Sequence, residues 1–484
     1  MPEVFHTYAS FGLQERKPMR FEADVFECEV EGVIPPELQG SYYRSGGDRQ
    51  YPSLENDIVL NGDGMVSAFH FEDGHVSFRS RYVQTERLKA ERGARRRLYG
   101  HYRNRHTDDP SVSNLPQRNN TGNTFAFEHH GKLYALREDS HPYQIDMETL
   151  ETLDVADLGA LQSTALTAHP KVDPVTGEWW SYGVFADGEP STRASLHVFD
   201  KHGNLIREQM FDTPYPGLSH DWGVTRQHLI FPIMPLVADD ARLRAGGAYY
   251  QYDPDLPGKW GVMPRDGDPA RDMRWFDIPG LVMGHVMNAY SEGDKVIIDT
   301  PASPGNCFSF FADKSGRFPT MPETITQITR ITFDLSKPDD EAVSLRPVEG
   351  ALGDMPRIDE RFAMQKHTTG YFALRDFPQM GVGQIMWGTG ELKVHELVGA
   401  ASQEPIFVPR SADAPEGDGF ILTVVDRFEE KRADLLVLNG NDVSRPPIAT
   451  VKLPFAMPMA FHGCWVARGA ADAAEVARSG RNAA

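Results

Sequence analysis

The stretch Glu292-Gly293-Asp294-Lys295-Val296-Ile297-Ile298-Asp299 joins a tight-turn signal to the first residues of a β-strand. A Gly-Asp pair is common in two-residue hairpin turns, and the β-branched residues that follow it favour an extended backbone. The same combination recurs at Glu72-Asp73-Gly74, which precedes Val76-Ser77-Phe78, and at His130-Gly131, which precedes Lys132-Leu133-Tyr134-Ala135-Leu136. Turn signals followed by short β-type runs are typical of antiparallel hairpins. The sequence therefore predicts a chain built from hairpins.

Turn signals also occur in the rest of the chain, for example at Asp173-Pro174-Val175-Thr176-Gly177, His202-Gly203-Asn204 and Asn439-Gly440-Asn441. Long amphipathic helical stretches are scarce. We expect one helix over 86–97 and a disordered tail over 468–484. Repeated hairpins without a helical complement predict an all-β fold, either a β-propeller or a large sandwich. A propeller would bring distant segments together at its axis.

Length and composition limit the possible functions. The chain has 484 residues. At about 150 residues per domain this length would make roughly three domains, but closed all-β folds can form larger single domains. We therefore expect a single domain over 1–484. The net charge of −20 disfavours nucleic acid and anionic membrane surfaces as partners. The sparse cysteines Cys28, Cys307 and Cys464 argue against a disulfide framework. With no visible signal peptide and no apolar run of about 20 residues, we expect a cytoplasmic protein that does not enter the membrane.

Four histidines lie in short, distinctive settings far apart in the sequence: Ala168-His169-Pro170, Ser219-His220-Asp221-Trp222, Gly284-His285-Val286-Met287-Asn288 and Phe461-His462-Gly463-Cys464-Trp465. Each one alone is more simply explained as a core or capping residue. Together, four neutral imidazoles at one point would form a metal site without a charged ligand, which suits iron, copper or zinc. No two of them share a helical turn, so they can meet only through the fold.

These settings, in this order, resemble the iron ligands of the carotenoid cleavage oxygenase family. Further segments share the resemblance, which extends over roughly residues 20–467: Gly32–Gly40 followed by Tyr43-Arg44, Asn61–Met65, Glu404–Arg410 and Pro415–Gly419. Within the family, the chain is most similar to the lignostilbene dioxygenase and isoeugenol oxygenase branch. The resemblance implies a seven-bladed β-propeller with a cap of loops and short helices over an axial metal site.

The resemblance also implies an activity. His169, His220, His285 and His462 would hold Fe²⁺, and the enzyme would use O2 to cleave the C=C bond of a phenylpropenoid or stilbene-like aromatic alkene, giving aldehydes. The expected partners are this small substrate and O2, and the chain would form a homodimer. Two alternatives stay open: an oxygenase that cleaves apocarotenoids, and an inactive propeller that serves as a binding scaffold.

In the family, glutamates hydrogen-bond three of the ligating histidines. Glu138 and Glu404 occupy two of these positions, and Asp354 occupies the third. Because aspartate is one methylene shorter, we expect Asp354 to reach its histidine only through a backbone shift or a bridging water. Alternatively, Asp354 is an ordinary turn residue, and Glu349 or no residue takes the role.

At the substrate end, Tyr102 matches a tyrosine that holds the phenolic oxygen in the branch, while Arg137 replaces its lysine. Arginine stays charged and cannot act as a base near neutral pH, but it can stabilise a phenolate or bind a carboxylate. Alternatively, Arg137 forms a structural ion pair with Glu138 or Asp139. The branch places an aromatic residue near Val59 and Leu60, where this chain has none. An apolar tunnel is expected from the aromatic residues Phe308, Phe310 and Phe311.

Overall fold

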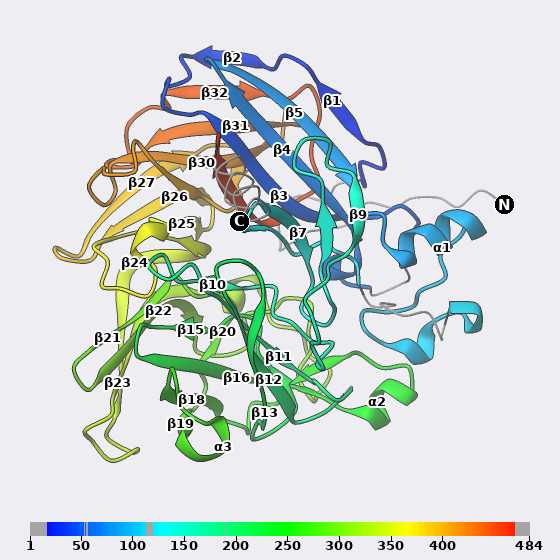
Figure 1. Ribbon diagram of the computed structural model, residues 1–484, viewed down its shortest axis with the longest axis vertical. Coiled ribbons are helices and arrows are strands. Elements are labelled where there is room, and N and C mark those ends of the chain that lie inside the picture. The colour runs from blue at the N-terminus through cyan, green and yellow to red at the C-terminus, as the bar shows by residue number, and fades with distance from the viewer. Residues whose placement is uncertain (1–16, 53, 55–56, 113–119, 189, 470–484) are drawn as a thin grey trace, which may run out of the picture.

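Short antiparallel strands in five sheets dominate the computed structural model, which describes residues 17–52, 54, 57–112, 120–188 and 190–469. Figure 1 shows the sheets placed around a central region, an arrangement that fits the predicted propeller. The predicted all-β class is confirmed. The tail predicted to be disordered lies outside the described residues from 470 onward.

The strands of the five sheets have the following bounds. The nine-stranded sheet contains, in spatial order, β1 (Ala23–Val25), β5 (His75–Tyr82), β4 (Asp63–Glu72), β3 (Gly40–Asp48), β33 (Ala460–Ala467), β6 (Phe125–His129), β7 (Lys132–Leu136), β8 (Tyr143–Ile145) and β9 (Thr152–Val155). The four-stranded sheet contains β10 (Lys171–Val172), β11 (Trp179–Val184), β12 (Arg193–Phe199) and β13 (Leu205–Asp212). One six-stranded sheet contains β14 (Gly217–Leu218), β15 (Gly223–Val224), β16 (His228–Ala238), β17 (Tyr250–Tyr252), β18 (Gly258–Pro264) and β19 (Arg274–Ile278).

The remaining two sheets complete the circle. The eight-stranded sheet contains β20 (Val282–Met283), β21 (Asn288–Glu292), β22 (Lys295–Ser303), β23 (Gln327–Asp334), β24 (Val343–Arg357), β25 (Thr369–Asp376), β26 (Gln379–Met386) and β27 (Glu391–Leu397). The other six-stranded sheet contains β2 (Glu29–Gly32), β32 (Ala449–Lys452), β31 (Arg432–Asn439), β30 (Gly419–Arg427), β28 (Ala400–Ser402) and β29 (Ile406–Pro409).

The predicted hairpins are confirmed at their turns. Strands β21 and β22 pair up to Glu292 and Lys295, so Gly293-Asp294 is the two-residue loop, with Gly293 at φ 59°. At the Asp73-Gly74 and His130-Gly131 loops both residues have positive φ, as type I′ turns require. These turns match the right-handed twist of the strands that they join. The short local signals in the sequence therefore decide most of the antiparallel pairing.

Early and late segments of the chain pair with each other in two of the sheets. Strand β3 pairs antiparallel with the last strand, β33, and β2 pairs antiparallel with β32. Strand β22 is covered on both faces, since every residue after Lys295 is buried. This closure explains how residues far apart in the sequence meet at the centre.

The larger sheets each contain a weak junction. Strands β33 and β6 meet only at one parallel pair, His462 with Phe125. The long β24 pairs with β23 through its first part and with β25 through its last residues, from Gly353 onward. If both junctions are blade boundaries, the five sheets make the seven blades predicted. That number, and the expectation of a single domain over 1–484, stay predictions.

Helices are few and short. They are α1 (Glu86–Ala94), α2 (Asp240–Arg244), α3 (Pro269–Asp272) and the 3₁₀ turns η1 (Val59–Asn61), η2 (Arg105–Thr107), η3 (Pro110–Val112), η4 (Met321–Thr324) and η5 (Glu360–Phe362). The helix expected over 86–97 is confirmed but ends earlier, because Arg95 adopts the left-handed conformation, with φ 54°. Thr85 caps its start by accepting a hydrogen bond from the Leu88 backbone N–H.

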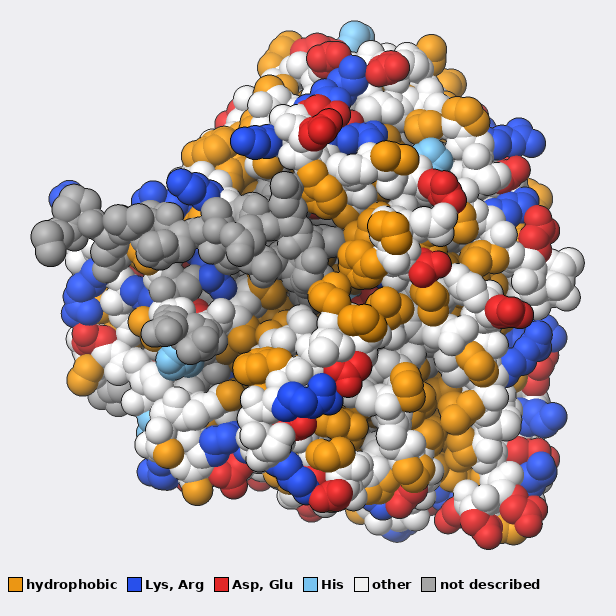
Figure 2. Space-filling model, turned by 180° about the vertical axis from the view of Figure 1, so that it is seen from behind, with side chains coloured by type: hydrophobic (Ala, Val, Ile, Leu, Met, Phe, Trp, Pro, Cys, Tyr) orange, Lys and Arg blue, Asp and Glu red, His pale blue; other side chains and the backbone are white. Residues whose placement is uncertain are grey.

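The surface mixes charged and apolar side chains. On the face opposite to the view of Figure 1, hydrophobic side chains gather toward the middle and charged side chains toward the edges (Figure 2). Within the part of the chain that the structure describes, helices are all too short or too polar to cross a bilayer. The expected cytoplasmic location stays a prediction.

Candidate metal centre and adjoining pocket

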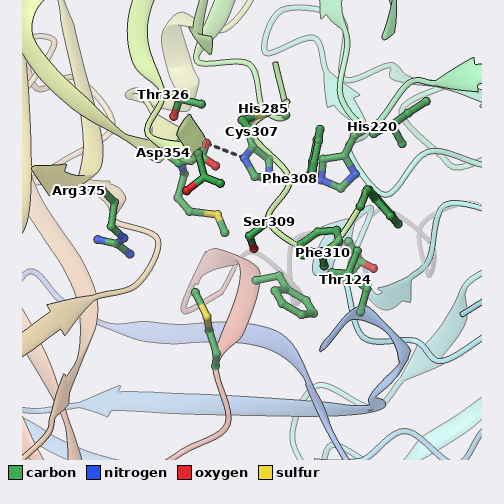
Figure 3. Close-up of a pocket in the computed structure, with 18 of the residues that line it drawn as sticks. Thr124, His220, His285, Cys307, Phe308, Ser309, Phe310, Thr326, Asp354 and Arg375 are labelled. Atoms are coloured by element: carbon green, nitrogen blue, oxygen red, sulfur yellow. Dashed lines mark hydrogen bonds and ion pairs between the residues drawn. The ribbon is translucent and has the colours of Figure 1, made fainter. Parts of the chain in front are cut away.

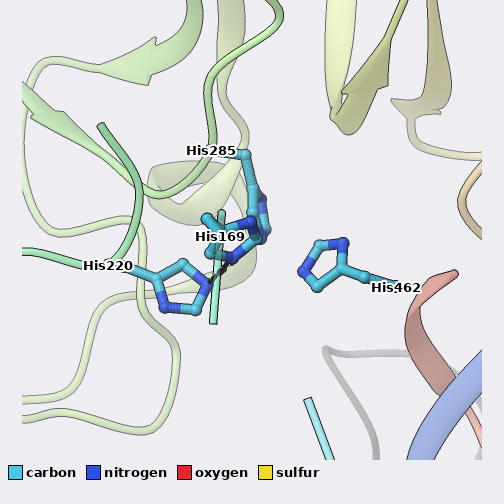
Figure 4. A group of neighbouring side chains, drawn as sticks. All are labelled: His169, His220, His285 and His462. Carbon is cyan, nitrogen blue, oxygen red and sulfur yellow. Dashed lines mark hydrogen bonds between the residues drawn. The ribbon is translucent and has the colours of Figure 1, made fainter. Parts of the chain in front are cut away.

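The structure brings the four predicted histidines together. His169 lies just before β10, His220 between β14 and β15, His285 between β20 and β21, and His462 on β33. One ring nitrogen from each lies within 4.8 Å of those from the other three. Figure 4 shows the four rings directed toward one another from separate segments. The four histidines, which are far apart in the sequence, therefore form one cluster.

The donor set fits a metal ion. The Nε2 atoms of His169 and His220 are 3.1 Å apart, and those of His220 and His285 are 3.3 Å apart. Two nitrogens at right angles on one ion, each at about 2.1 Å, would be about 3 Å apart. Burial, reinforced by the neighbouring imidazoles, holds the pKa of His169 well below its usual range, so this ring is neutral. Neutral imidazoles are ligands for iron, copper, nickel and zinc.

Carboxylates orient three of the rings. The Nδ1–H of His285 donates to Oδ1 of Asp354 (2.8 Å), and the Nδ1–H of His462 donates to Oε1 of Glu404 (2.8 Å). His220 makes the same hydrogen bond with Glu138. A donor at Nδ1 fixes the tautomer and leaves the Nε2 lone pair for a metal. Burial alone would raise the pKa of the Glu138 carboxyl. His220 and then Arg137 outweigh this effect and lower the pKa to about 2, so the carboxyl is ionised.

Asp354 reaches His285 directly, because the backbone around it is irregular. The register between β24 and β25 shifts between Asp354 and Arg357, and Met355 has φ 55°. The Met355 N–H also donates to Oδ1 of Asp354 (2.8 Å), which holds the short side chain in place. The backbone irregularity that a shorter carboxylate was expected to need is thus present. The alternative residue, Glu349, is exposed on β24.

His169 is held differently from the other three. Its closest carboxylate oxygen is Oδ2 of Asp221, which lies 3.7 Å from its Nδ1 and is too far for a good hydrogen bond. Asp221 instead pairs with Lys171 (2.7 Å) and accepts the backbone N–H of Val286 (2.7 Å). The indole of Trp222 donates to the carbonyl of His169 (3.0 Å). Sequence reasoning quoted Asp221 and Trp222 only as neighbours of His220 and missed these contacts with another histidine.

A pocket opens beside the cluster and touches His220, His285 and His462. Figure 3 shows His220 and His285 at its wall. Most of its wall is apolar or aromatic. It includes Leu60, Leu218, Tyr250, Phe308, Phe310, Phe311 and Met459. The predicted tunnel residues Phe308 and Phe310 therefore line it, with their ring centroids 5.9 Å apart. Short helices cover this side, since η1 supplies Leu60 and η4 supplies Met321.

Tyr102 and Arg137 both line the same pocket. The Arg137 guanidinium lies over the Tyr102 ring, 4.9 Å from its centroid. Arg137 donates to the carbonyl of Leu60 (2.9 Å) and to Asn123 (3.2 Å), and it pairs with Asp139 (3.4 Å). Burial raises the pKa of Tyr102 to about 12, although Arg137 opposes the rise. Arg137 therefore has both an ion pair and a place in the pocket wall.

Val59 does not line the pocket. It begins η1 and is buried, whereas the next residue, Leu60, faces the cavity. Adjacent residues of a tight 3₁₀ turn point in different directions, so a contact placed near this pair falls on one of them. Of this pair, only Leu60 lines the pocket, and the substrate contact expected at Val59 stays a prediction.

A second cavity adjoins the same histidines. It touches His169, His285 and His462, and its wall includes Lys171, Asp221 and Arg357. Arg357 pairs with Glu404 (3.3 Å), the carboxylate that orients His462. This side of the cluster is more charged than the aromatic pocket, and sequence reasoning did not identify Lys171 or Arg357.

Comparisons with known proteins agree with this geometry. Residues 16–467 match the family described as RPE65, retinal pigment epithelial membrane protein. The chain is 40% identical to an isoeugenol monooxygenase of Pseudomonas nitroreducens, over 93% of this chain and 96% of the relative. It superposes on the crystal structure of Pseudomonas brassicacearum lignostilbene dioxygenase with a TM-score of 0.89 and 38% identity, covering 93% of this chain and 96% of the other.

A further solved structure bears on the metal. Cobalt-substituted Synechocystis ACO, an apocarotenoid oxygenase, matches with a TM-score of 0.78 and 25% identity, covering 92% of this chain and 96% of the other. That relative was solved with a transition metal in place of its own. Together with the convergence of four histidines, this supports a metal centre in the present chain.

Proposed function

Because the chain belongs to the RPE65/carotenoid oxygenase family, we propose that it is an iron(II)-dependent oxygenase that cleaves the C=C bond of an aromatic alkene with O2, giving aldehydes. The substrate class is a phenylpropenoid or a stilbene. The observation that carries the proposal is the cluster of four histidines at the wall of an aromatic pocket. The relatives named for isoeugenol and lignostilbene support the choice of substrate over an apocarotenoid.

The four histidines would hold the metal, and Glu138, Asp354 and Glu404 would orient their rings. Iron(II), when bound, supplies the one-electron chemistry that lets O2 react with a closed-shell alkene. Neutral imidazole ligands would leave the charge of the ion to be balanced by these three carboxylates. The same carboxylates keep the Nδ1 protons in place and the Nε2 lone pairs free.

Tyr102 and Arg137 would bind the phenolic end of the substrate. With a pKa near 12, Tyr102 stays protonated at neutral pH and can donate a hydrogen bond to the phenolic oxygen. Arg137 stays charged, so it cannot accept the phenolic proton, but it stabilises negative charge on that oxygen. The two side chains thus orient the ring without acting as a base.

The aromatic wall would position the alkene and exclude water. Phe308, Phe310 and Phe311 form a continuous group, with the Phe310 and Phe311 rings 4.7 Å apart. Packing a flat substrate against these rings would hold its double bond beside the cluster and keep solvent from the reacting atoms. The expected homodimer and cytoplasmic location rest on the sequence alone and stay proposals.

The test is reconstitution of the metal-free protein under anaerobic conditions with Fe(II), or with Zn(II) as a redox-inert control. Isoeugenol, a 4-hydroxystilbene and an apocarotenal are then supplied with O2, and aldehydes and O2 uptake are measured. We expect aldehydes from the aromatic alkenes with Fe(II) only, and none from the His462→Ala variant. Cleavage of the apocarotenal alone would favour the apocarotenoid alternative, and absence of aldehyde from all three would favour a binding scaffold.

A further inference from the structure

Arg375 is a second arginine in the pocket wall, and neither the sequence nor the comparisons give it a role. It lies near the end of β25 and lines the pocket with Asp354, Phe377 and Met459. Figure 3 shows it on the opposite side of the pocket from His220 and Thr124. It follows Leu374, whose partner on β24 is Gly353, next to the carboxylate that holds His285.

The two pocket arginines thus approach the histidine cluster from different sides. Arg137 precedes Glu138, which hydrogen-bonds His220. Arg375 lies beside the Asp354–His285 pair. A substrate whose double bond lies at the cluster would direct one end toward Arg137 and the other toward Arg375.

The guanidinium of Arg375 is fixed but not ion-paired. Nη1 donates to the carbonyl of Leu374 (2.8 Å), and Nη2 donates to the carbonyl of Ser402 (2.6 Å). A guanidinium has five N–H donors, so three are left over. Among the described residues, no carboxylate oxygen lies within 4.0 Å of its nitrogens.

The other arginines around the cluster differ in this respect. Arg137 pairs with Asp139, and Arg357 pairs with both Glu360 (3.1 Å) and Glu404 (3.3 Å). Burial lowers the pKa of Arg375 to about 10, and the more distant Asp354 and Asp426 offset only part of this. The side chain is still charged at neutral pH, in a desolvated place where an anion would be attracted strongly.

We propose that Arg375 forms an anion-binding subsite that recognises a carboxylate on the half of the substrate remote from Tyr102 and Arg137. The inference rests on the proposed function and narrows its substrate class to two-ring alkenes that carry a carboxylate on the second ring. A planar carboxylate can accept two parallel hydrogen bonds from the remaining donors of the fork. A one-ring phenylpropenoid would occupy only the Arg137 side.

A purely structural role is the competing explanation, because Arg375 joins β25 to the Ser402 carbonyl on β28. The chain offers a matched control for it. Arg242 also donates to backbone carbonyls, those of Val237 (2.6 Å), Ala248 (2.8 Å) and Tyr249 (2.9 Å), and it does not line the pocket. Loss of either arginine removes hydrogen bonds to carbonyls, but only loss of Arg375 removes a charge from the pocket.

The experiment compares three 4-hydroxystilbenes that differ on the second ring: one unsubstituted, one with a carboxylate and one with its methyl ester. We expect the wild type to prefer the carboxylate over the ester in kcat/KM. In Arg375→Met, the ratio of kcat/KM for the carboxylate to that for the ester should fall about 10-fold or more, since a hydrogen-bonded charge is lost. In Arg242→Met this ratio should not change.

An equal fall for all three substrates in Arg375→Met would overturn the inference in favour of a structural role. If that variant does not fold, the wild-type comparison decides, because a preference for the ester over the carboxylate would also overturn it. If the wild type cleaves neither these stilbenes nor isoeugenol, the proposed function fails, and the subsite is then tested separately. Anaerobic calorimetry with the metal-free protein should show tighter binding of the carboxylate than of the ester, and the reverse order would reject the subsite.

Discussion

The histidine cluster and the wall of the adjoining pocket are held in different ways. At the cluster, three of the rings are fixed by hydrogen bonds to carboxylates, and even the shorter Asp354 is brought into contact by an irregular backbone. In the pocket, Phe308 and Phe310 line the cavity through van der Waals contacts, which have no preferred direction. Arg375 keeps N–H donors that its two hydrogen bonds to carbonyls do not use. The difference teaches that the metal side tolerates little change, whereas the pocket side can vary in what it binds.

Loss of a metal-ligating histidine should give the largest effect on iron content and on activity. His285→Ala removes one of four nitrogen donors and the imidazole N–H that Asp354 accepts. We expect loss of bound iron and at least a 100-fold fall in aldehyde formation, measured by metal analysis and by product chromatography. His395→Ala, on β27 away from the cluster, is the matched control. Full iron content in His285→Ala would contradict the ligand assignment.

Weakening an orienting carboxylate should have a smaller effect on the same side. Asp354→Asn keeps the size of the side chain but not its charge, so the His285 ring is less firmly oriented and less basic. We expect a loss of about 10- to 100-fold in iron affinity, measured by competition with a chelator. Unchanged affinity would mean that the 2.8 Å contact between His285 and Asp354 does not matter for the metal.

On the pocket side, substitution of Arg137 should change catalysis without changing the metal. Arg137→Ala removes a charged donor beside Tyr102, and we expect kcat/KM for phenolic alkenes to fall about 10-fold or more, with iron content kept. Arg137→Lys should recover part of the activity because it restores the charge. Equal loss of iron and activity would instead make Arg137 a structural partner of Asp139.

The smallest effect on catalysis is expected from loss of the Tyr102 hydroxyl, which is a neutral hydrogen-bond donor. Tyr102→Phe removes one hydroxyl and leaves the ring under the Arg137 guanidinium. We expect kcat/KM for 4-hydroxystilbene to fall about 2- to 10-fold, the usual range for one neutral hydrogen bond. The 4-methoxy analogue, measured in parallel, should show a smaller fall, and an equal fall for both substrates would separate Tyr102 from the phenolic oxygen.

Much of the fold could be predicted because its signals are local. The turn at Gly293-Asp294 and the β-branched run after it decide a hairpin without reference to the rest of the chain. The four histidines could be grouped only through the family resemblance, since their meeting depends on the closure of the whole circle. For Asp354 the sequence predicted a backbone shift or a bridging water, and the choice between them depends on the register shift between β24 and β25.

The residues that sequence reasoning missed depend on long-range packing. Asp221 follows His220 in the chain, yet its nearest histidine nitrogen on the metal cluster is that of His169. Arg375 looks like an ordinary strand-end charge until β25 is placed beside β24 and Ser402. In both cases the contacting residue, His169 for Asp221 and Ser402 for Arg375, is distant in sequence. No sequence pattern links the two residues of either pair.

The pairing of β33 with β3 has a consequence for biosynthesis. His462, the last of the four ligands, lies on β33, the strand that joins the end of the chain to its beginning. A ribosome delivers this strand after the segments that carry His169, His220 and His285 have already emerged. A chain that stops before β33 therefore lacks both its closing strand and its fourth ligand. Binding of a metal by all four histidines thus requires that translation has passed β33, because this one strand supplies both the pairing with β3 and the fourth ligand.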